Sequence, residues 1–236
     1  MQKTIKLNTG FEMPTLGLGT YKSEPNKVGE AVKYALLGCG YKHIDGASIY
    51  GNESEIGATY QEVFKKINRE EIFITSKLWN TDHAALDVET ACRKTLSDLH
   101  LEYLDLYLMH WGVAFKHGGD LQPVVNGHAL TEKISVRETW QAMESLVAKG
   151  LVKSIGVANF DATMLVDLMT YAKITPATNQ IEVHPYNTQN ELINYCNHLG
   201  IAVTAYSPLG RHGAQGVTGP SILDDAHILE LSKKYA

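Results

Sequence analysis

Short apolar segments with the character of strands alternate with longer amphipathic segments with the character of helices, seven times along this chain of 236 residues. Regular alternation of this kind predicts a parallel β-sheet covered by its helical crossovers. The helix at 28–40, for example, places Val28, Val32 and Leu36 on one face and stops at its glycines. The predicted strands are 16–20, 41–46, 71–79, 103–111, 152–160, 177–185 and 201–210. The predicted helices are 28–40, 54–67, 85–101, 136–150, 161–172, 189–199 and 224–236.

Two parallel α/β architectures compete for this pattern. An open, doubly wound sheet usually carries a glycine-rich phosphate loop directly after its first strand. The segment GLGTYKSEP at 17–25 lacks the third glycine of that loop and does not run directly into a helix. A (β/α)8 TIM barrel needs about 250 residues, and this chain falls slightly short, with one strand missing. We favour the barrel, as a single domain over 1–236, preceded by a hairpin in which 4–8 and 10–14 flank a turn.

The composition disfavours several classes of function. The net charge of −5, without a block of Lys or Arg, argues against nucleic acid as a partner. No apolar run approaches the roughly 18 residues needed to cross a bilayer, and the first ten residues contain no apolar signal core. Cys39, Cys92 and Cys196 lie far apart, and neither they nor the histidines have metal-ligand spacing. We therefore expect reduced thiols in a cytoplasmic protein without a metal site.

Almost every predicted strand ends in a polar or titratable side chain. In a barrel, function lies at the carboxyl ends of the strands, so the repetition is a stronger signal than any one residue. The residues at these ends are Asp45 with Tyr50 on the following loop, Lys77, His110, Asn159, Gln180 with His184, and Tyr206 with Ser207.

The first of these residues suggest proton-transfer chemistry. Asp45, Lys77 and His110 end successive strands, which lie about 4.8 Å apart, so their side chains can converge. A lysine there needs a partner, and Asp45 can supply it. A unit charge about 4 Å from a phenol favours the phenolate by roughly 4 kcal/mol at an effective dielectric of about 20. We therefore expect Lys77 to lower the pKa of Tyr50, by at most about three units, so that Tyr50 transfers a proton beside a substrate oxygen oriented by His110.

Each residue taken alone also has a structural explanation. A lone Asp45–Lys77 pair is more often a structural ion pair, Tyr50 could be a wall residue, and His110 could be a satisfied core histidine. Buried amides such as Asn159 and Gln180 also serve as loop anchors. The whole series in order favours the catalytic interpretation.

The series resembles the aldo-keto reductases over essentially the whole chain. The resemblance implies an eight-stranded α/β barrel closed at its base by an N-terminal hairpin. It also implies reduction of aldehydes and ketones by hydride from a nicotinamide cofactor, usually NADPH, with NADH left open. The matching segments, in the family's order and spacing, are GFEMPTLGLGTYKS, HIDGASIYGNESEIG, IFITSKLWN, YLDLYLMHW, LVKSIGVANF, NQIEVHPY and AYSPLG.

The resemblance also implies residue roles. Asn159 and Gln180 would hydrogen-bond the nicotinamide carboxamide, Tyr206 would stack on the ring, and the loop at 112–135 would help to define a pocket for an apolar aldehyde. The implied catalytic residues are Asp45, Tyr50, Lys77 and His110, with Tyr50 as the general acid. The implied cofactor contacts are Thr20, Lys22, Asp45, Asn159, Gln180, Tyr206, Ser207 and Leu209. The implied substrate contacts are Tyr21, Trp79, His110 and Trp111.

Some positions depart from the family's pattern. Ala158 replaces the serine that is usual before the asparagine, and Gly46 replaces a hydroxyl or small side chain after the aspartate. Tyr21 stands where a tryptophan often lines the pocket. Arg211-His212-Gly213 replaces a loop that often carries an acidic clasp over the pyrophosphate. We therefore expect the cofactor to leave more easily or to sit differently.

The sequence stops at Ala236, inside the seventh predicted helix. We expect the eighth strand, the last helix and the C-terminal loop to be missing, and with them the family's basic residues for the NADPH 2′-phosphate. A barrel without one strand has two unpaired edges, so we expect this sequence to be part of a longer protein.

Two functions are compatible with the sequence. The first is a cytoplasmic, monomeric, NADPH-dependent reductase of small carbonyl compounds, an oxidoreductase acting on CH–OH groups. The alternative is a catalytically impaired barrel that acts as a binding or structural protein.

Overall fold

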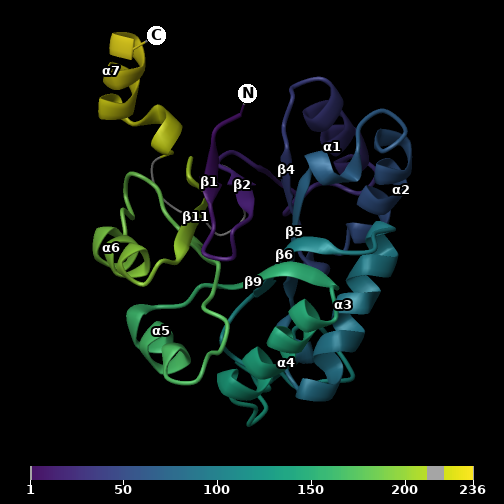
Figure 1. The fold of residues 1–236 in the computed structure, drawn as a ribbon. Helices are drawn as coiled ribbons and strands as arrows, with labels where there is room; N and C mark the ends of the chain where they lie inside the picture. The colour runs from purple at the N-terminus through teal and green to yellow at the C-terminus, as the bar shows by residue number, and fades with distance from the viewer. Residues whose placement is uncertain (1, 212–220, 236) are drawn as a thin grey trace.

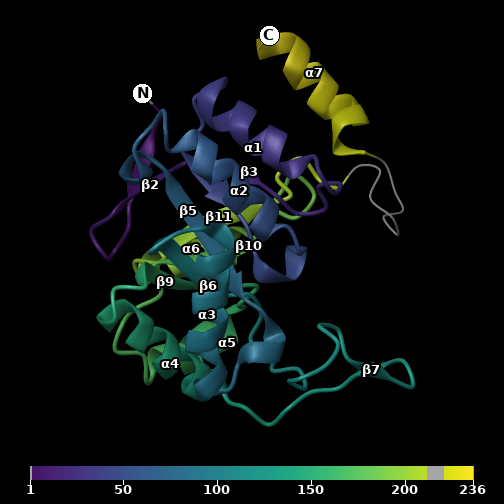
Figure 2. The same cartoon turned by 90° about the vertical axis from the view of Figure 1, so that its right-hand side faces the viewer.

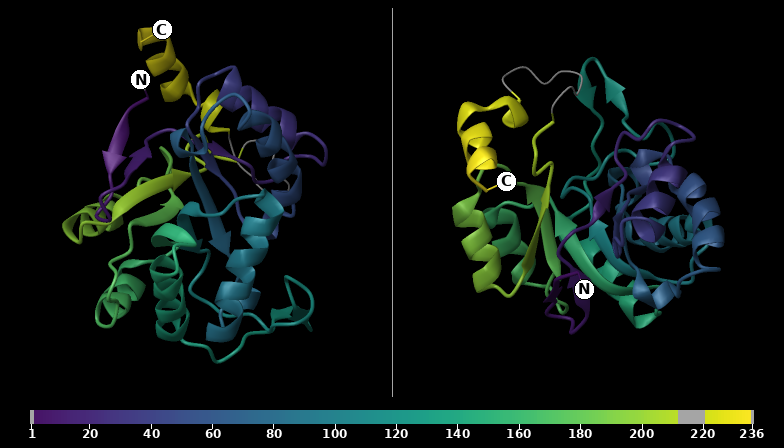
Figure 3. Two further views of the ribbon diagram at one scale, coloured as in Figure 1. Left: turned by 45° about the vertical axis from the view of Figure 1, so that its right-hand side comes forward. Right: turned by 90° about the horizontal axis from the view of Figure 1, so that it is seen from above.

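Seven parallel strands form the central sheet of this computed structural model, which describes residues 2–211 and 221–235 (Figure 1). Their order in the sheet follows their order in the chain, without the reversal of a doubly wound sheet. The sheet is curled, with the helices outside it (Figure 3). The strands are β3 (Leu18–Gly19), β4 (His43–Asp45), β5 (Phe73–Leu78), β6 (Leu104–Met109), β9 (Val152–Ala158), β10 (Thr178–Glu182) and β11 (Ala202–Tyr206). Each predicted strand is present, and the curl favours the barrel over the open sheet.

Except for the last one, which has no buried residue, the helices follow the strands and cover their outer face. Their apolar stripes pack on outward-facing strand residues such as Ile44, Ile74 and Leu78 to form the larger of two core clusters. No helix in 2–211 or 221–235 is long and apolar enough to span a membrane. The helices are α1 (Val28–Leu37), α2 (Glu53–Val63), α3 (Ala85–Leu99), α4 (Val136–Ala148), α5 (Ala162–Met169), α6 (Asn190–His198) and α7 (Ala226–Tyr235). The predicted helices are therefore present, although several end one to four residues earlier than predicted.

An N-terminal hairpin closes the base of the barrel, as the family resemblance implies. Strands β1 (Thr4–Lys6) and β2 (Glu12–Pro14) pair antiparallel. Leu7 and Met13 are buried in the second core cluster with inward-facing strand residues, including Phe73, Leu106 and Leu108. The hairpin therefore fills the barrel interior from one end and leaves the other end for polar side chains.

A second hairpin lies in the loop between β6 and α4, on the opposite side of the molecule from the first (Figure 2). Its strands are β7 (Val124–Val125) and β8 (His128–Ala129). Asn126 and Gly127 form the turn with φ of 52° and 79°. Asn-Gly is the usual sequence of such a turn, because both central residues need positive φ. The sequence analysis predicted no strands there, although this dipeptide was a usable signal.

Strand β5 separates the two environments that matter for function. All six of its residues are buried, because helices cover one face and the barrel interior covers the other. Phe73 belongs to the interior cluster, whereas Ile74 and Leu78 belong to the cluster under the helices. By alternation, Lys77 points into the barrel and Ser76 points outward.

Candidate active site

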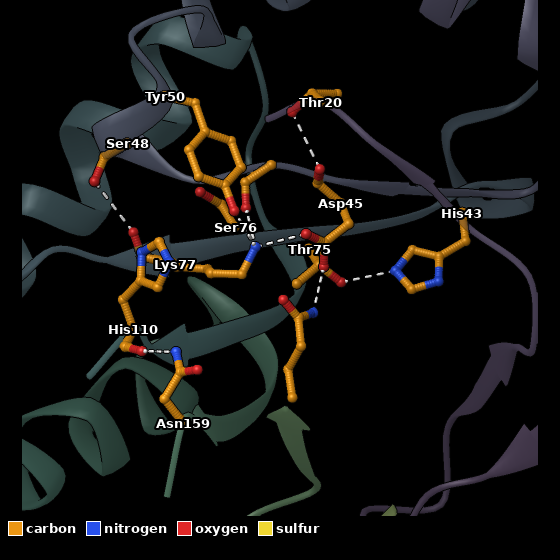
Figure 4. A network of polar contacts seen from close by, with 12 residues as sticks. Thr20, His43, Asp45, Ser48, Tyr50, Thr75, Ser76, Lys77, His110 and Asn159 are labelled. Atoms are coloured by element: carbon orange, nitrogen blue, oxygen red, sulfur yellow. Dashed lines mark hydrogen bonds and ion pairs between the residues drawn. The ribbon is translucent and has the colours of Figure 1, made fainter. Parts of the chain in front are cut away.

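Lys77 lies at the centre of the polar network at the open end of the barrel (Figure 4). Its ammonium donates to Asp45 Oδ1 at 2.5 Å and to the Gly46 carbonyl at 2.8 Å. It also lies 3.3 Å from the hydroxyl oxygen of Tyr50. The side chain is only 1% exposed, so it is an almost fully buried charge. Parallel pairing of β4 with β5 places Asp45 beside Thr75, which brings the carboxylate within reach of Lys77.

The carboxylate of Asp45 determines the charge state of this lysine. Burial works against the ammonium, but attraction to Asp45 and contact with Tyr50 outweigh it and raise the pKa of Lys77. Lys77 therefore stays positively charged at neutral pH. The predicted meeting of Asp45, Lys77 and Tyr50 is present.

The predicted direction of the Tyr50 pKa shift was wrong. Burial raises the pKa of the phenol, and the charge of Lys77 offsets only part of that rise. Asp45, which neutralises much of the Lys77 charge, acts in the same direction as burial. Tyr50 therefore keeps its proton firmly in this state, which suits an acid that must be protonated before it acts.

His110 ends strand β6 beside this group, and it is not a satisfied core histidine. Its ring centroid lies 5.9 Å from that of Tyr50 and 5.2 Å from that of Trp79, both in edge-on contact. Burial, followed by the charge of Lys77, lowers the pKa of His110 to about 3, so the ring is neutral. The buried Nδ1 atom has no hydrogen-bond partner within the described ranges. A neutral imidazole ring at the mouth can donate one hydrogen bond to a substrate oxygen.

The two predicted amides join the network from neighbouring strands. Gln180 on β10 donates to Asp45 Oδ2 at 2.7 Å. Asn159, just after β9, donates to the His110 carbonyl at 2.9 Å and accepts from the Tyr206 hydroxyl at 2.9 Å. Asn159 adopts a φ of 61°, a conformation that asparagine tolerates better than most residues. Hydrogen bonds therefore involve the ends of six strands around one mouth.

Aromatic side chains lie next to Tyr50 and His110. The ring of Tyr21 lies 4.9 Å from that of Tyr50, although Tyr21 is 62% exposed. Trp79 is buried, and its indole N–H donates to the Leu121 carbonyl at 2.6 Å. Trp111 lies just after the end of β6 and is 41% exposed. The loop at 112–135 thus reaches the pocket, as the sequence analysis expected, and Leu121 is the residue through which it does so.

Comparison with known proteins agrees with this geometry. The model of the Aldo/keto reductase family matches residues 14–218. The chain belongs to the aldo-keto reductase family. Aldo-keto reductase family 1 member A1 of Rattus norvegicus and that of Homo sapiens are each 50% identical to it, over 98% of this chain and 73% of theirs. The structure of the aldose reductase from Schistosoma japonicum aligns with a TM-score of 0.92 and 42% identity, over 99% of this chain and 75% of that one.

Membership of the aldo-keto reductase family settles the fold and the broad chemistry. The fold is that of the family's (β/α)8 barrel, of which the curled parallel sheet is the core. The family consists of oxidoreductases that act on carbonyls and alcohols with nicotinamide cofactors.

The other predicted cofactor residues of this aldo-keto reductase form no hydrogen bond with the side chains of the catalytic group in the described structure. The Thr20 hydroxyl is buried and donates to the Asp45 carbonyl at 3.1 Å, so it supports the backbone of β4. Lys22 and Leu209 are exposed, and Ser207 ends β11 with a φ of 49°. None of these three side chains contacts the catalytic group in the described structure. Of the loop expected to alter cofactor release, Arg211 pairs with Glu182 at 2.7 Å, and His212 and Gly213 lie outside the described residues.

The sequence analysis did not identify two residues that hold the turn carrying Tyr50. The Ser48 hydroxyl donates to the Lys77 carbonyl at 3.1 Å, and Asn52 donates to the Thr20 carbonyl at 2.9 Å. Both flank Tyr50 in this aldo-keto reductase, but their partners are distant in the sequence, so no local pattern indicated them.

Proposed function

We propose that the protein reduces an aldehyde or ketone to an alcohol by hydride transfer from NADPH, with Tyr50 as the general acid. The observation that carries the proposal is the contact of the Tyr50 hydroxyl with a buried, charged Lys77 ammonium, 3.3 Å away. A buried cation next to a phenol stabilises the phenolate that forms when the phenol gives its proton to a substrate.

The residues of the chain divide the proton chemistry among them. Tyr50 donates its proton to the carbonyl oxygen as negative charge develops on that oxygen. The ammonium of Lys77 then stabilises the tyrosinate, and Asp45 holds the ammonium in place through the 2.5 Å contact. The raised pKa of Tyr50 keeps the acid protonated beforehand. His110, whose ring is neutral, orients the carbonyl oxygen by a hydrogen bond.

The mouth contains groups that fit a nicotinamide. Gln180 Oε1 accepts no hydrogen bond from any described residue, so it can accept one from a carboxamide. Tyr206 offers a partly exposed ring, and Asn159 can exchange its bond to the Tyr206 hydroxyl for a ligand. When bound, the nicotinamide supplies hydride to the carbonyl carbon. Asp45, Thr20, Lys22, Ser207 and Leu209 complete the proposed cofactor contacts.

We infer an apolar, small-molecule carbonyl substrate, because the rings of Tyr21 and Trp79 lie next to those of Tyr50 and His110. Trp111, which follows His110 in the chain, is a further proposed substrate contact. From what is usual in the family, we also infer that the protein uses NADPH rather than NADH, acts in the cytoplasm and is a monomer.

The test is cofactor consumption by the purified protein with NADPH and with NADH, against aromatic and aliphatic aldehydes. We expect oxidation of NADPH that depends on the aldehyde. A folded protein that binds NADPH but turns over no carbonyl would contradict the proposal and support the alternative of a binding barrel.

A further inference from the structure

Glu53 places a buried carboxylate directly behind the active site, on the opposite face of β5 from Lys77. The residue is only 5% exposed. It accepts hydrogen bonds from the Ser76 hydroxyl at 2.6 Å and from the Thr95 hydroxyl at 3.0 Å. No basic side chain in the described structure forms an ion pair with it. Burial raises its pKa, and the two hydroxyls offset part of that rise.

A buried carboxylate without a cation is costly, so it needs an explanation. Removing such a group from water is unfavourable in a low-dielectric interior, and two neutral hydroxyl donors offset only part of this penalty. Its position as the first residue of α2 helps, because a helix N-terminus favours negative charge. An apolar side chain of similar size would fill the same space without the penalty. The carboxylate therefore points to a requirement for defined geometry at this place.

The place is the end of the turn that carries Tyr50. The chain leaves the sheet at Asp45, presents Tyr50 in a short helical turn, and enters α2 at Glu53. Ser48 holds the first half of this turn to the Lys77 carbonyl at 3.1 Å, as Figure 4 shows. Glu53 holds the second half to Ser76, the residue just before Lys77. The turn is thus fixed at both ends to adjacent residues of the strand that carries the ammonium.

We propose that Glu53 is a positioning residue, whose bonds to Ser76 and Thr95 set the distance between the Tyr50 hydroxyl and the Lys77 ammonium. The proposal rests on the proposed reductase function of Tyr50. The hydroxyl and the ammonium are 3.3 Å apart, near the outer limit of a hydrogen bond, so a small outward shift of the turn would break the contact. Displacement of a reacting group by about 1 Å can cost about 100-fold in rate.

The experiment compares Glu53→Ala, Glu53→Gln and a control, Glu144→Ala, with the wild type. Glu144 also holds two hydrogen bonds to a loop, at 2.7 and 2.9 Å, but on α4 and far from the mouth. We expect Glu53→Ala to lower kcat at least tenfold, with the Kd of NADPH changed less than threefold. Glu53→Gln can still accept from Ser76 and donate to Thr95, so kcat should stay within threefold of wild type. Glu144→Ala should leave kcat unchanged.

Two results would overturn the proposal. The first is a folded Glu53→Ala protein with wild-type kcat. The second is a crystal structure of that variant with an unchanged Tyr50–Lys77 distance, a measurement that does not need turnover and so separates this proposal from the reductase assignment. If Glu53→Ala does not fold, Ser76→Ala decides: it keeps the carboxylate and should lower kcat several-fold, and wild-type kcat there would refute the positioning role.

Discussion

At the scale of single residues, neighbouring groups determine the protonation states of the ionisable side chains at the mouth of the barrel. Lys77 is almost fully buried yet charged, because Asp45 lies 2.5 Å away. His110 is equally close to the mouth but has no acidic hydrogen-bond partner among the described residues, so burial and the Lys77 charge keep it neutral with a pKa of about 3. The same mouth therefore holds a fixed positive charge and an uncharged hydrogen-bonding ring.

The neutral His110 predicts a pH dependence of stability. Its pKa is about 3 in the folded protein and about 6.5 when unfolded, so the unfolded chain binds more protons between these values. Stability is therefore lost as the pH falls from 6.5 towards 3, by at most about 1.4 kcal/mol per pH unit from this residue. Urea unfolding of wild type and His110→Gln at pH 6.5, 5.5 and 4.5 should show a shallower loss in the variant. Equal slopes would mean that His110 is not buried in its neutral form.

The sequence predicted which residues meet but not how they titrate. Asp45, Lys77 and His110 could be placed together because parallel strands end at one edge. The direction of the Tyr50 pKa shift was wrong, because it depends on the balance between burial and a partly neutralised charge. The role of Glu53 was missed for a similar reason, since its two partners lie on β5 and α3.

At the scale of elements, the packing of α2 on α3 fixes where the Tyr50 turn ends, because the turn leads directly into α2. Gly57 makes this approach possible, because a Cβ there would lie 2.1 Å from the Asp98 carbonyl oxygen, at the end of α3. That oxygen belongs to the backbone, so only a shift of a helix could relieve the overlap. The alternation of strands and helices was readable from the sequence, whereas this close contact was not.

Gly57→Ala tests the contact. Glycine to alanine inside a helix ordinarily stabilises a protein by about 0.5–1 kcal/mol. Here we expect a loss of about 1–3 kcal/mol in the free energy of unfolding, because the added methyl group overpacks the interface. Chemical denaturation measures the sign directly. A gain in stability would show that α2 and α3 are less tightly packed than described.

At the scale of the whole molecule, the barrel separates a stabilising floor from a functional mouth. The N-terminal hairpin inserts Leu7 and Met13 among inward-facing strand residues at the floor. The polar network lies at the other ends of the same strands. Stability and activity should therefore respond to different substitutions.

Leu7→Ala tests this separation. Leu7 is 3% exposed, so its truncation should leave a cavity and cost about 2–5 kcal/mol in the free energy of unfolding. The kcat and KM of the variant, measured well below its Tm, should stay within about twofold of wild type. A large loss of kcat in a fully folded sample would mean that the floor also shapes the mouth.

The most direct test of the account is single-turnover oxidation of NADPH by wild type and Tyr50→Phe with an aromatic aldehyde, each protein being saturated with cofactor. The substitution removes only the hydroxyl that contacts Lys77. General acids contribute about 10²- to 10⁴-fold, so we expect the rate of hydride transfer to fall at least about 100-fold while the Kd of NADPH is unchanged. An undiminished rate in Tyr50→Phe would contradict the assignment of Tyr50 as the proton donor.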